Sequence, residues 1–129
     1  MAPFERYMQT YNRIDIALDT FPYAGGTTTC DALWMGVPVV TLRGRTAVGR
    51  GGASLLTTLD LTEWIADSPA EYVQIAQRGA SDLSRLAELR AGLRQRMSQS
   101  RLCDAPRFTS DLEAQLRWMW QQWCATSPR

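Results

Sequence analysis

The feature that most constrains the fold of this chain is a glycine-rich turn between two apolar segments. The first segment, "IDIALDTF" (14–21), alternates apolar with polar residues, which predicts a strand that ends at the proline and glycines after it. "TTTCDALWMG" (27–36) predicts a helix closed by its last glycine, and "VPVVTL" (37–42) predicts a buried strand rich in β-branched residues. Strand, turn, helix and strand form one βαβ unit, whose strands are parallel and whose crossover is right-handed.

The rest of the chain predicts mostly helices around a short sheet. "EWIA" (63–66) is expected to form a third short strand. Helices are expected at residues 3–13, in the segment that ends at about 59, and at 69–82, 83–97 and 109–124. A usual doubly wound domain has about five or six strands. The predicted fold class is therefore α/β with a partial Rossmann-like sheet and a helical C-terminal tail, and residues 1–129 are expected to be a single domain within a larger α/β unit.

The basic residues exclude several kinds of chemistry. All 14 are arginine, and the chain has no lysine and no histidine. Lysine Schiff-base chemistry, imidazole base catalysis and histidine-ligated metals are therefore excluded within this chain. The remaining carboxylates, thiols and hydroxyls show no suggestive pairing, so we predict no catalytic residue and no metal site. A formal net charge of +1 is too small to favour a nucleic-acid partner.

The cysteines and the hydropathy pattern indicate a cytoplasmic protein. Cys30, Cys103 and Cys124 are far apart and lack the C-x-x-C spacing of zinc or redox sites, so we expect them to be reduced and mostly buried. No charged-then-apolar leader begins the sequence, and no apolar run approaches the ~20 residues that span a bilayer. We therefore expect a soluble chain without a membrane partner.

The turn "AGGTTT" lies where open α/β sheets bind ligands, after the carboxyl end of a strand and before a helix. Gly25 and Gly26 are able to take positive φ and, without Cβ atoms, let a ligand approach the backbone. Thr27 and Thr28 add hydroxyl donors to the free N–H groups of the first helical turn, which carries the positive end of the helix dipole. The turn therefore predicts a cradle for phosphate groups.

Two interpretations of this helix start remain open from the spacing alone. In a nucleotide site, Asp31 would turn away from the phosphates and accept hydrogen bonds from ribose hydroxyls, as an acid does in dinucleotide sites. In a purely structural helix start, "TTCD" forms a capping box, in which Thr28 caps the helix and Asp31 reaches back. The spacing gives the two interpretations about equal weight.

A longer pattern carries a resemblance to a known family. "YNRIDIALDTFPYAGGTTTCDALWMGVPVVTLRG", "EWIADSPAEYVQIA" and "RFTSDLEAQLRWMW" are similar to the C-terminal catalytic half of the O-GlcNAc transferase and SPINDLY-like glycosyltransferases, and the resemblance covers essentially all 129 residues. It implies a GT-B architecture, in which two Rossmann-like halves face a cleft. The nucleotide-sugar donor would be held mainly by the C-terminal half, to which this chain corresponds.

The resemblance implies roles for particular residues. The expected donor-binding residues are Gly25, Gly26, Thr27, Thr28, Asp31, Arg50, Tyr7 and Ala2. The two threonines would contact the diphosphate, and the acid would hydrogen-bond the ribose. Ala2, Phe4 and Tyr7 are candidates for the wall around the base. Animal members have a histidine in place of Gly26, and a lysine and a histidine in place of Phe4 and Tyr7, so base recognition is expected to rely on backbone and aromatic contacts here.

On this resemblance, the chain is the donor-binding part of a protein O-glycosyltransferase that transfers GlcNAc from UDP-GlcNAc to serine or threonine. No other cofactor is expected. The N-terminal catalytic half and the upstream tetratricopeptide repeats that bind acceptor proteins have no counterpart in these 129 residues, so the chain alone is expected to be inactive. The alternatives are a GDP-fucose-dependent O-fucosyltransferase, a non-catalytic Rossmann-like interaction module and a nucleotide-sugar epimerase.

Other side chains near the predicted ligand edge have both structural and functional interpretations. Arg50 could pair with a donor phosphate in bidentate geometry or be a solvated or helix-capping residue, and the solvated interpretation is preferred for Arg43 and Arg45. Asp19 is expected to cap the turn after the first strand. Cys30 is expected to be a small core thiol, although the helix dipole could lower its pKa.

Apolar side chains form a stripe on the last predicted helix and are expected to face the core. They are Phe108, Leu112, Leu116, Met119 and Trp123, with Trp118 and Trp120 beside them. These are many apolar side chains for one helix of a small domain. We therefore expect Trp118 or Trp120 to be exposed and to support self-association.

Overall fold

The computed structural model describes residues 3–126, and its elements follow the predicted order. The helices are α1 (Phe4–Thr10), α2 (Thr27–Trp34), α3 (Gly51–Thr58), α4 (Pro69–Ser81), α5 (Leu83–Ser98) and α6 (Ala105–Thr126). Short 3₁₀ helices are η1 (Tyr11–Arg13), η2 (Val48–Arg50), η3 (Thr62–Trp64) and η4 (Arg101–Cys103). The strands are β1 (Ala17–Leu18), β2 (Val39–Leu42) and β3 (Ile65–Ala66).

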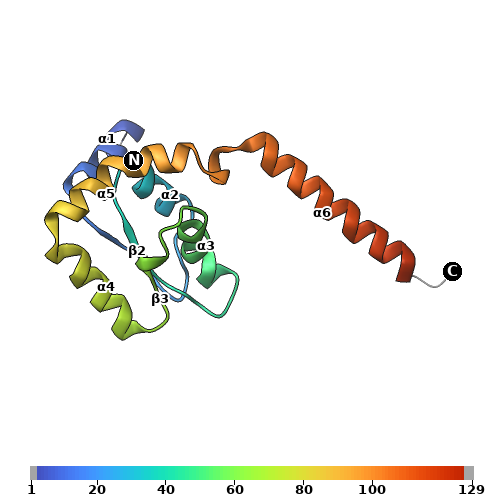
Figure 1. Cartoon of the computed structure of the whole chain (residues 1–129), viewed down its shortest axis with the longest axis horizontal. Helices are drawn as coiled ribbons and strands as arrows, with labels where there is room; N and C mark the ends of the chain where they lie inside the picture. The colour runs from blue at the N-terminus through green and yellow to red at the C-terminus, as the bar shows by residue number, and fades with distance from the viewer. Residues whose placement is uncertain (1–2, 127–129) are drawn as a thin grey trace.

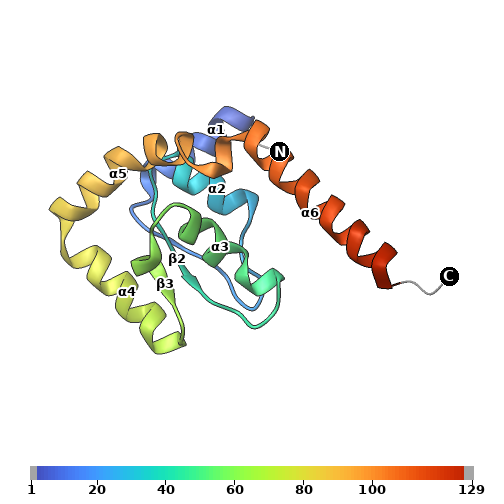
Figure 2. The same ribbon diagram turned by 45° about the vertical axis from the view of Figure 1, so that its right-hand side comes forward.

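The three strands form one parallel sheet in the order β1-β2-β3. Ala17 pairs with Val39, and Thr41 pairs with Ile65. The connecting helices α2 and α3 lie on one side of the sheet and α4 lies on the other (Figures 1 and 2). The predicted βαβ unit with parallel strands is therefore confirmed, and so is the α/β fold class.

The core is centred on β2. Val40 and Thr41 are fully buried, because helices cover both faces of this strand, and the sequence therefore shows a continuous β-branched run rather than alternation. Leu33 of α2, Leu56 of α3 and Leu93 of α5 are also fully buried around it. Helices from both halves of the chain thus share one apolar core.

β1 is shorter than the predicted strand. Among the described residues it is an edge strand that pairs only with β2: the N–H of Ala17 donates to the oxygen of Pro38, just before β2, and the N–H of Asp19 donates to Val40 O, both at 2.9 Å. Leu18 is 59% exposed, although the alternation placed it on the apolar face of the strand. One-sided pairing explains why the regular strand is brief.

α2 ends at a glycine, as predicted. Gly36 has a φ of +77°, its N–H donates to Leu33 O at 3.1 Å, and the N–H of Val37 donates to Ala32 O at 2.8 Å. These bonds satisfy carbonyl groups at the end of the helix. A Cβ at Gly36 would also lie 2.8 Å from the backbone oxygen of Arg90 in α5, so packing requires glycine here as well.

α6 differs from the prediction. It projects away from the rest of the molecule (Figures 1 and 2), and none of its described residues is buried. The stripe that was expected to face the core is 47% exposed at Leu112 and 64% exposed at Phe108. A periodic stripe predicts an apolar helix face but does not identify the surface that covers it. The expected exposure of Trp118 and Trp120 is confirmed, at 56% and 62%.

The cysteines are less buried than predicted. Cys30 is partly buried, whereas Cys103 and Cys124 are exposed, because they lie in η4 and on the projecting α6. Through residues 3–126, no helix is both long and apolar enough to cross a membrane.

Candidate functional site

Asp19 anchors the glycine turn at the carboxyl end of β1. It is 8% exposed, its Oδ1 accepts from the N–H of Gly25 at 2.6 Å, and its Oδ2 accepts from Thr41 Oγ1 at 2.7 Å. Its backbone oxygen accepts from Tyr72 Oη of α4 at 2.8 Å. Hydrogen bonds to both carboxylate oxygens compensate for the burial of the charge. The predicted capping of the turn is confirmed, and the same residue also ties the turn to β2 and α4.

The start of α3 packs against this turn. A Cβ on Gly52 would overlap Asp19 Oδ2 and lie 2.5 Å from Thr41 Oγ1, and a Cβ on Gly51 would lie 3.4 Å from Gly25 O. The two helical glycines therefore allow the N-terminus of α3 to approach the turn. No side chain caps α3, so its first N–H groups are not satisfied within the helix.

α2 begins at the same place without a side-chain cap. Its N-cap residue is Gly26, and its first hydrogen bond runs from the N–H of Cys30 to Gly26 O at 3.0 Å. The N–H groups of Thr27 and Thr28, whose side chains are exposed, therefore remain available to a ligand. The capping-box interpretation is wrong, because Thr28 lies inside the first turn of the helix and cannot be its N-cap.

The two glycines of the turn differ. Gly26 has a φ of −124°, and Gly36 is the glycine of residues 3–126 with positive φ, so the turn does not use the positive φ that glycine permits. A Cβ on Gly25 would lie 2.5 Å from Thr29 Oγ1, whereas a Cβ on Gly26 would meet nothing within 4 Å. Packing therefore requires glycine at 25, and the open side of the backbone is at 26.

Asp31 is held by the N-terminal helix. Tyr7 Oη donates to Asp31 Oδ2 at 2.9 Å, and it lies 2.8 Å from Tyr11 Oη. Because Tyr7 has a single hydroxyl hydrogen, Tyr11 donates in the second bond. The hydrogen bond with Tyr11, then burial, then the hydrogen bond with Asp31 raise the pKa of Tyr7 well above its ordinary value, so its hydroxyl stays a donor at neutral pH. Tyr7 therefore orients the Asp31 carboxylate.

A hollow of ≈ 170 Å³ lies beside the turn, between η1, β1 and α2. Of the predicted donor-binding residues, Gly25 and Thr28 line it. Asp31 and Tyr7 form a hydrogen-bonded pair on α2 and α1. Ala2 is outside the described residues.

The loop after β2 brings Arg50 beside the turn. The N-H of Ala24 donates to Val48 O at 3.2 Å, and Arg50 is exposed at the N-cap position of α3. Arg43, in contrast, pairs with Asp67 at 3.3 Å on the surface, which fits the solvated interpretation. The backbone of Arg50 thus lies at the uncapped N-terminus of α3, which packs against the turn that begins α2.

The thiol of Cys30 is not activated. Burial is the largest cause that raises its pKa, and the charges of Asp31 and Cys103 raise it further. The raised pKa agrees with the expected core thiol, since Cys30 is partly buried and packs against the core, and it gives no support to a thiol activated by the helix dipole. Within residues 3–126, no cluster of three or more histidine, cysteine or acidic side chains could hold a metal ion.

Sequence reasoning missed several residues that support the turn. Thr41 donates to the Asp19 carboxylate, and Tyr72 donates to the Asp19 backbone oxygen. Gly52 has no side chain that would collide with the carboxylate. A hydroxyl within an otherwise aliphatic buried strand was the available signal for Thr41, because a buried polar group needs a partner. Tyr72 lies 53 residues from Asp19, and no local pattern indicates that contact.

Comparison with known proteins identifies the family. Residues 1–112 match Glycosyl transferase family 41. This chain belongs to that family. It is 49% identical over 118 residues to the "Probable UDP-N-acetylglucosamine--peptide N-acetylglucosaminyltransferase SPINDLY" of Eustoma exaltatum subsp. russellianum, a match that covers 92% of this chain and 13% of that protein. The resemblance to this glycosyltransferase family is confirmed.

More distant relatives and a solved structure agree. The "UDP-N-acetylglucosamine--peptide N-acetylglucosaminyltransferase" of Caenorhabditis elegans is 33% identical over 128 residues, which is 99% of this chain and 11% of that protein. A mutant O-GlcNAc transferase of Thermobaculum terrenum superimposes with a TM-score of 0.88 and 44% identity, over 98% of this chain and 24% of that one. This family 41 chain thus spans about an eighth of the curated relatives and has the fold of one part of a solved transferase.

Proposed function

We propose that this chain forms the donor-binding part of a protein O-glycosyltransferase that transfers GlcNAc from UDP-GlcNAc to serine or threonine. The observation that carries the proposal is the meeting of two uncapped helix N-termini, α2 and α3, at a glycine turn fixed by a buried carboxylate. Relatives named as UDP-N-acetylglucosamine transferases support the nature of the donor.

The site separates groups that suit a diphosphate from a group that suits a sugar. The N–H groups and hydroxyls of Thr27 and Thr28, with Arg50 nearby, present positive charge and hydrogen-bond donors to phosphate oxygens. Asp31 lies one turn further along α2 and is held by Tyr7. A carboxylate in this place accepts hydrogen bonds from ribose hydroxyls rather than repelling the phosphates.

In the transfer reaction, an acceptor hydroxyl attacks the anomeric carbon of the sugar, and the nucleoside diphosphate leaves with the electron pair of the broken bond. The groups from Gly25 to Thr28 would stabilise the negative charge that develops on the leaving oxygen. They face that charge without reorganisation, since Asp19 fixes Gly25. We propose that this chain supplies neither the base that takes the acceptor's proton nor the other wall of the cleft. The chain alone would therefore not transfer sugar to an acceptor protein.

The donor nucleotide distinguishes this proposal from its alternatives. Calorimetric titration of the chain with UDP and with GDP should give saturable binding with a preference for UDP. A preference for GDP would support the fucosyltransferase alternative, and absence of binding to either would support a non-catalytic module. Thr28→Val should weaken UDP binding about tenfold, as loss of a hydrogen bond to a charged group does, while Thr57→Val near the end of α3 serves as the control.

We further propose that the donor is bound without a metal ion, because Arg50 and the two helix ends supply positive charge where the diphosphate would lie. Chelation with EDTA should leave UDP affinity unchanged. Loss of binding on chelation would contradict this part of the proposal. We also place the protein in the cytoplasm, where the three free cysteines would stay reduced.

The exposed stripe of α6 supports self-association of the chain. Trp120 and Trp123 stack with ring centroids 5.3 Å apart, and the stripe runs along a helix without buried residues. Apolar surface of this kind is typical of a protein interface. Analytical ultracentrifugation should show a concentration-dependent dimer that Leu116→Glu disrupts, and a monomer at all concentrations would refute self-association.

A further inference from the structure

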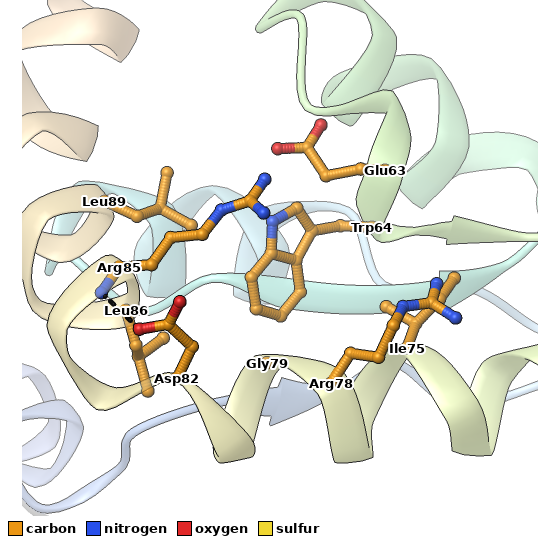
Figure 3. A pocket seen from close by; sticks show the side chains of 9 residues that line it. All are labelled: Glu63, Trp64, Ile75, Arg78, Gly79, Asp82, Arg85, Leu86 and Leu89. Atoms are coloured by element: carbon orange, nitrogen blue, oxygen red, sulfur yellow. Dashed lines mark hydrogen bonds between the residues drawn. The ribbon is translucent and has the colours of Figure 1, made fainter.

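A second pocket lies at the other end of the sheet from the glycine turn. η3, the C-terminal half of α4 and the start of α5 enclose its ≈ 140 Å³ (Figure 3). Trp64 comes directly before β3, whereas the turn follows β1, and the strands are parallel. The two sites therefore occupy opposite ends of the strands, and the second pocket plays no part in the proposed donor site.

The pocket has an apolar wall built on an indole ring. Ile75 and Leu86, at 4% and 6% exposure, lie beside Trp64, and Leu89 completes this wall. A Cβ on Gly79 would lie 2.7 Å from the Trp64 ring, so the glycine lets α4 approach the indole closely. An apolar cavity of about 150 Å³ accommodates benzene. The space therefore fits one aromatic ring or a short branched chain.

The indole also presents a polar group to the pocket. Trp64 is 7% exposed, and its N–H has no acceptor in the described part of the chain. No completely buried side-chain nitrogen or oxygen there lacks a partner, so this N–H keeps some exposure to solvent. Figure 3 shows the indole nitrogen turned toward the guanidinium group of Arg85. Both groups are donors, and a ligand that accepts hydrogen bonds would satisfy them together.

The charges around the pocket disfavour a ligand with more than one negative charge. Arg78 and Arg85 line it and take part in none of the ion pairs among residues 3–126. Glu63 and Asp82 line it too, and Asp82 Oδ1 accepts from the backbone N–H of Arg85 at 3.0 Å, which caps α5. The two acids balance the two arginines. A planar carboxylate matches one guanidinium, whereas a phosphate would need a surplus of positive charge.

We propose that this pocket binds a small monocarboxylic acid with an aromatic or branched apolar body. The body lies on the Trp64 ring between α4 and α5, and the carboxylate accepts from the indole N–H and from Arg85. Glu63 competes with the bound carboxylate for Arg85, because it is the nearby acid that has no role in a helix cap.

The proposal is tested with phenylacetate, whose ring and carboxylate are joined by one methylene group. Titration of the full chain is followed by NMR at the indole N–H of Trp64, which Trp64→Phe assigns. We expect saturable shifts with a Kd in the millimolar range, as befits a ligand of this size, and at least tenfold weaker binding of phenylacetamide, the neutral ligand of the same shape. Equal affinities for the two compounds, or no saturation with phenylacetate, would overturn the proposal.

Two exposed positions refine the test without disturbing the core. Arg85→Gln should weaken phenylacetate binding about tenfold, and Glu63→Gln should strengthen it several-fold by removing the competing charge. Arg101→Gln, an exposed arginine outside the pocket, is the matched control and should leave the affinity unchanged. Equal binding to the Arg85→Gln variant and the unsubstituted chain would refute the carboxylate site. UDP binding is measured separately, so failure of one proposal does not affect the other.

Discussion

Tyr7 Oη donates a hydrogen bond to Asp31 Oδ2 at 2.9 Å, although the two residues lie 24 positions apart. The contact joins α1 to the helix that starts at the glycine turn. It gives Asp31 a fixed orientation before any ligand arrives. The carboxylate is thus not engaged with the start of its own helix, and its other oxygen, Oδ1, has no partner in the described part of the chain.

Loss of the Tyr7 hydroxyl should weaken UDP binding by releasing Asp31. We expect Tyr7→Phe to lower the free energy of unfolding by about 0.5 to 1.5 kcal/mol, and to reduce UDP affinity less than Asp31→Ala, which should cost about 1 to 3 kcal/mol of binding. Calorimetry and urea unfolding measure the two effects. Tyr11→Phe removes the neighbouring hydroxyl but keeps the contact between Tyr7 and Asp31, so it should reduce UDP affinity less than Tyr7→Phe. Unchanged affinity in Asp31→Ala would remove Asp31 from the donor site.

Asp19 should be among the most sensitive polar residues of the chain. Asp19→Ala leaves the N–H of Gly25 and the hydroxyl of Thr41 without acceptors inside the protein. Unpaired buried donors cost about 1 to 3 kcal/mol each, so we expect a loss of about 3 kcal/mol in urea unfolding. Thr41→Val removes only one of the two donors and should cost less. A loss below that of Thr41→Val would show that Asp19 does not anchor the turn.

The two glycines of the turn form a matched pair. Gly25→Ala places a methyl group 2.5 Å from Thr29 Oγ1, whereas Gly26→Ala meets nothing within 4 Å. We expect overpacking at 25 to cost about 1 to 3 kcal/mol of unfolding free energy, and a change within about 0.5 kcal/mol at 26. Thermal and urea unfolding of both variants provide the comparison, and equal effects would mean that the turn is not packed as described.

Stability should fall at alkaline pH. Burial raises the pKa of Cys30 above its ordinary 9.0, and burial followed by the charge of Asp19 raises the pKa of Tyr72 above its ordinary 10.0. Both groups hold their protons more tightly in the folded state. Their contribution to the free energy of unfolding is therefore complete below pH 9 and is lost as pH rises through the folded pKa values. Urea unfolding between pH 7 and about 11 measures the decline. In the Cys30→Ala variant, the first part of this decline should disappear. If the variant and the unsubstituted chain have the same pH profile of stability, Cys30 does not cause that part of the decline.

The sequence predicts the elements whose signals are local. Gly36 closes α2, as expected from a glycine after an apolar helix, and the β-branched run at 39–42 forms the buried central strand. Periodicity also identified an apolar face on α6, but it assigned that face to the core. The helix instead projects from the molecule. The prediction failed because periodicity carries no information about the partner surface.

The site depends on contacts that no local pattern contains. The spacing of Thr28 and Asp31 fits a capping box, yet Asp31 binds Tyr7 and the helix starts one residue before Thr28. Asp19 was expected to cap the turn, and it does, but its second partner, Thr41, is on the neighbouring strand. Residues far apart in sequence therefore decide which of two locally equivalent interpretations the fold adopts.

The central claim is that the glycine turn and the start of α2 hold the donor diphosphate. The most direct measurement is an NMR titration of the chain with UDP, followed at the backbone amides of Gly25, Gly26, Thr27 and Thr28. The account predicts saturable shifts at these amides, with weaker effects from GDP at the same concentrations. Saturable UDP binding that leaves these four amides unshifted, or no saturation at all, would contradict it.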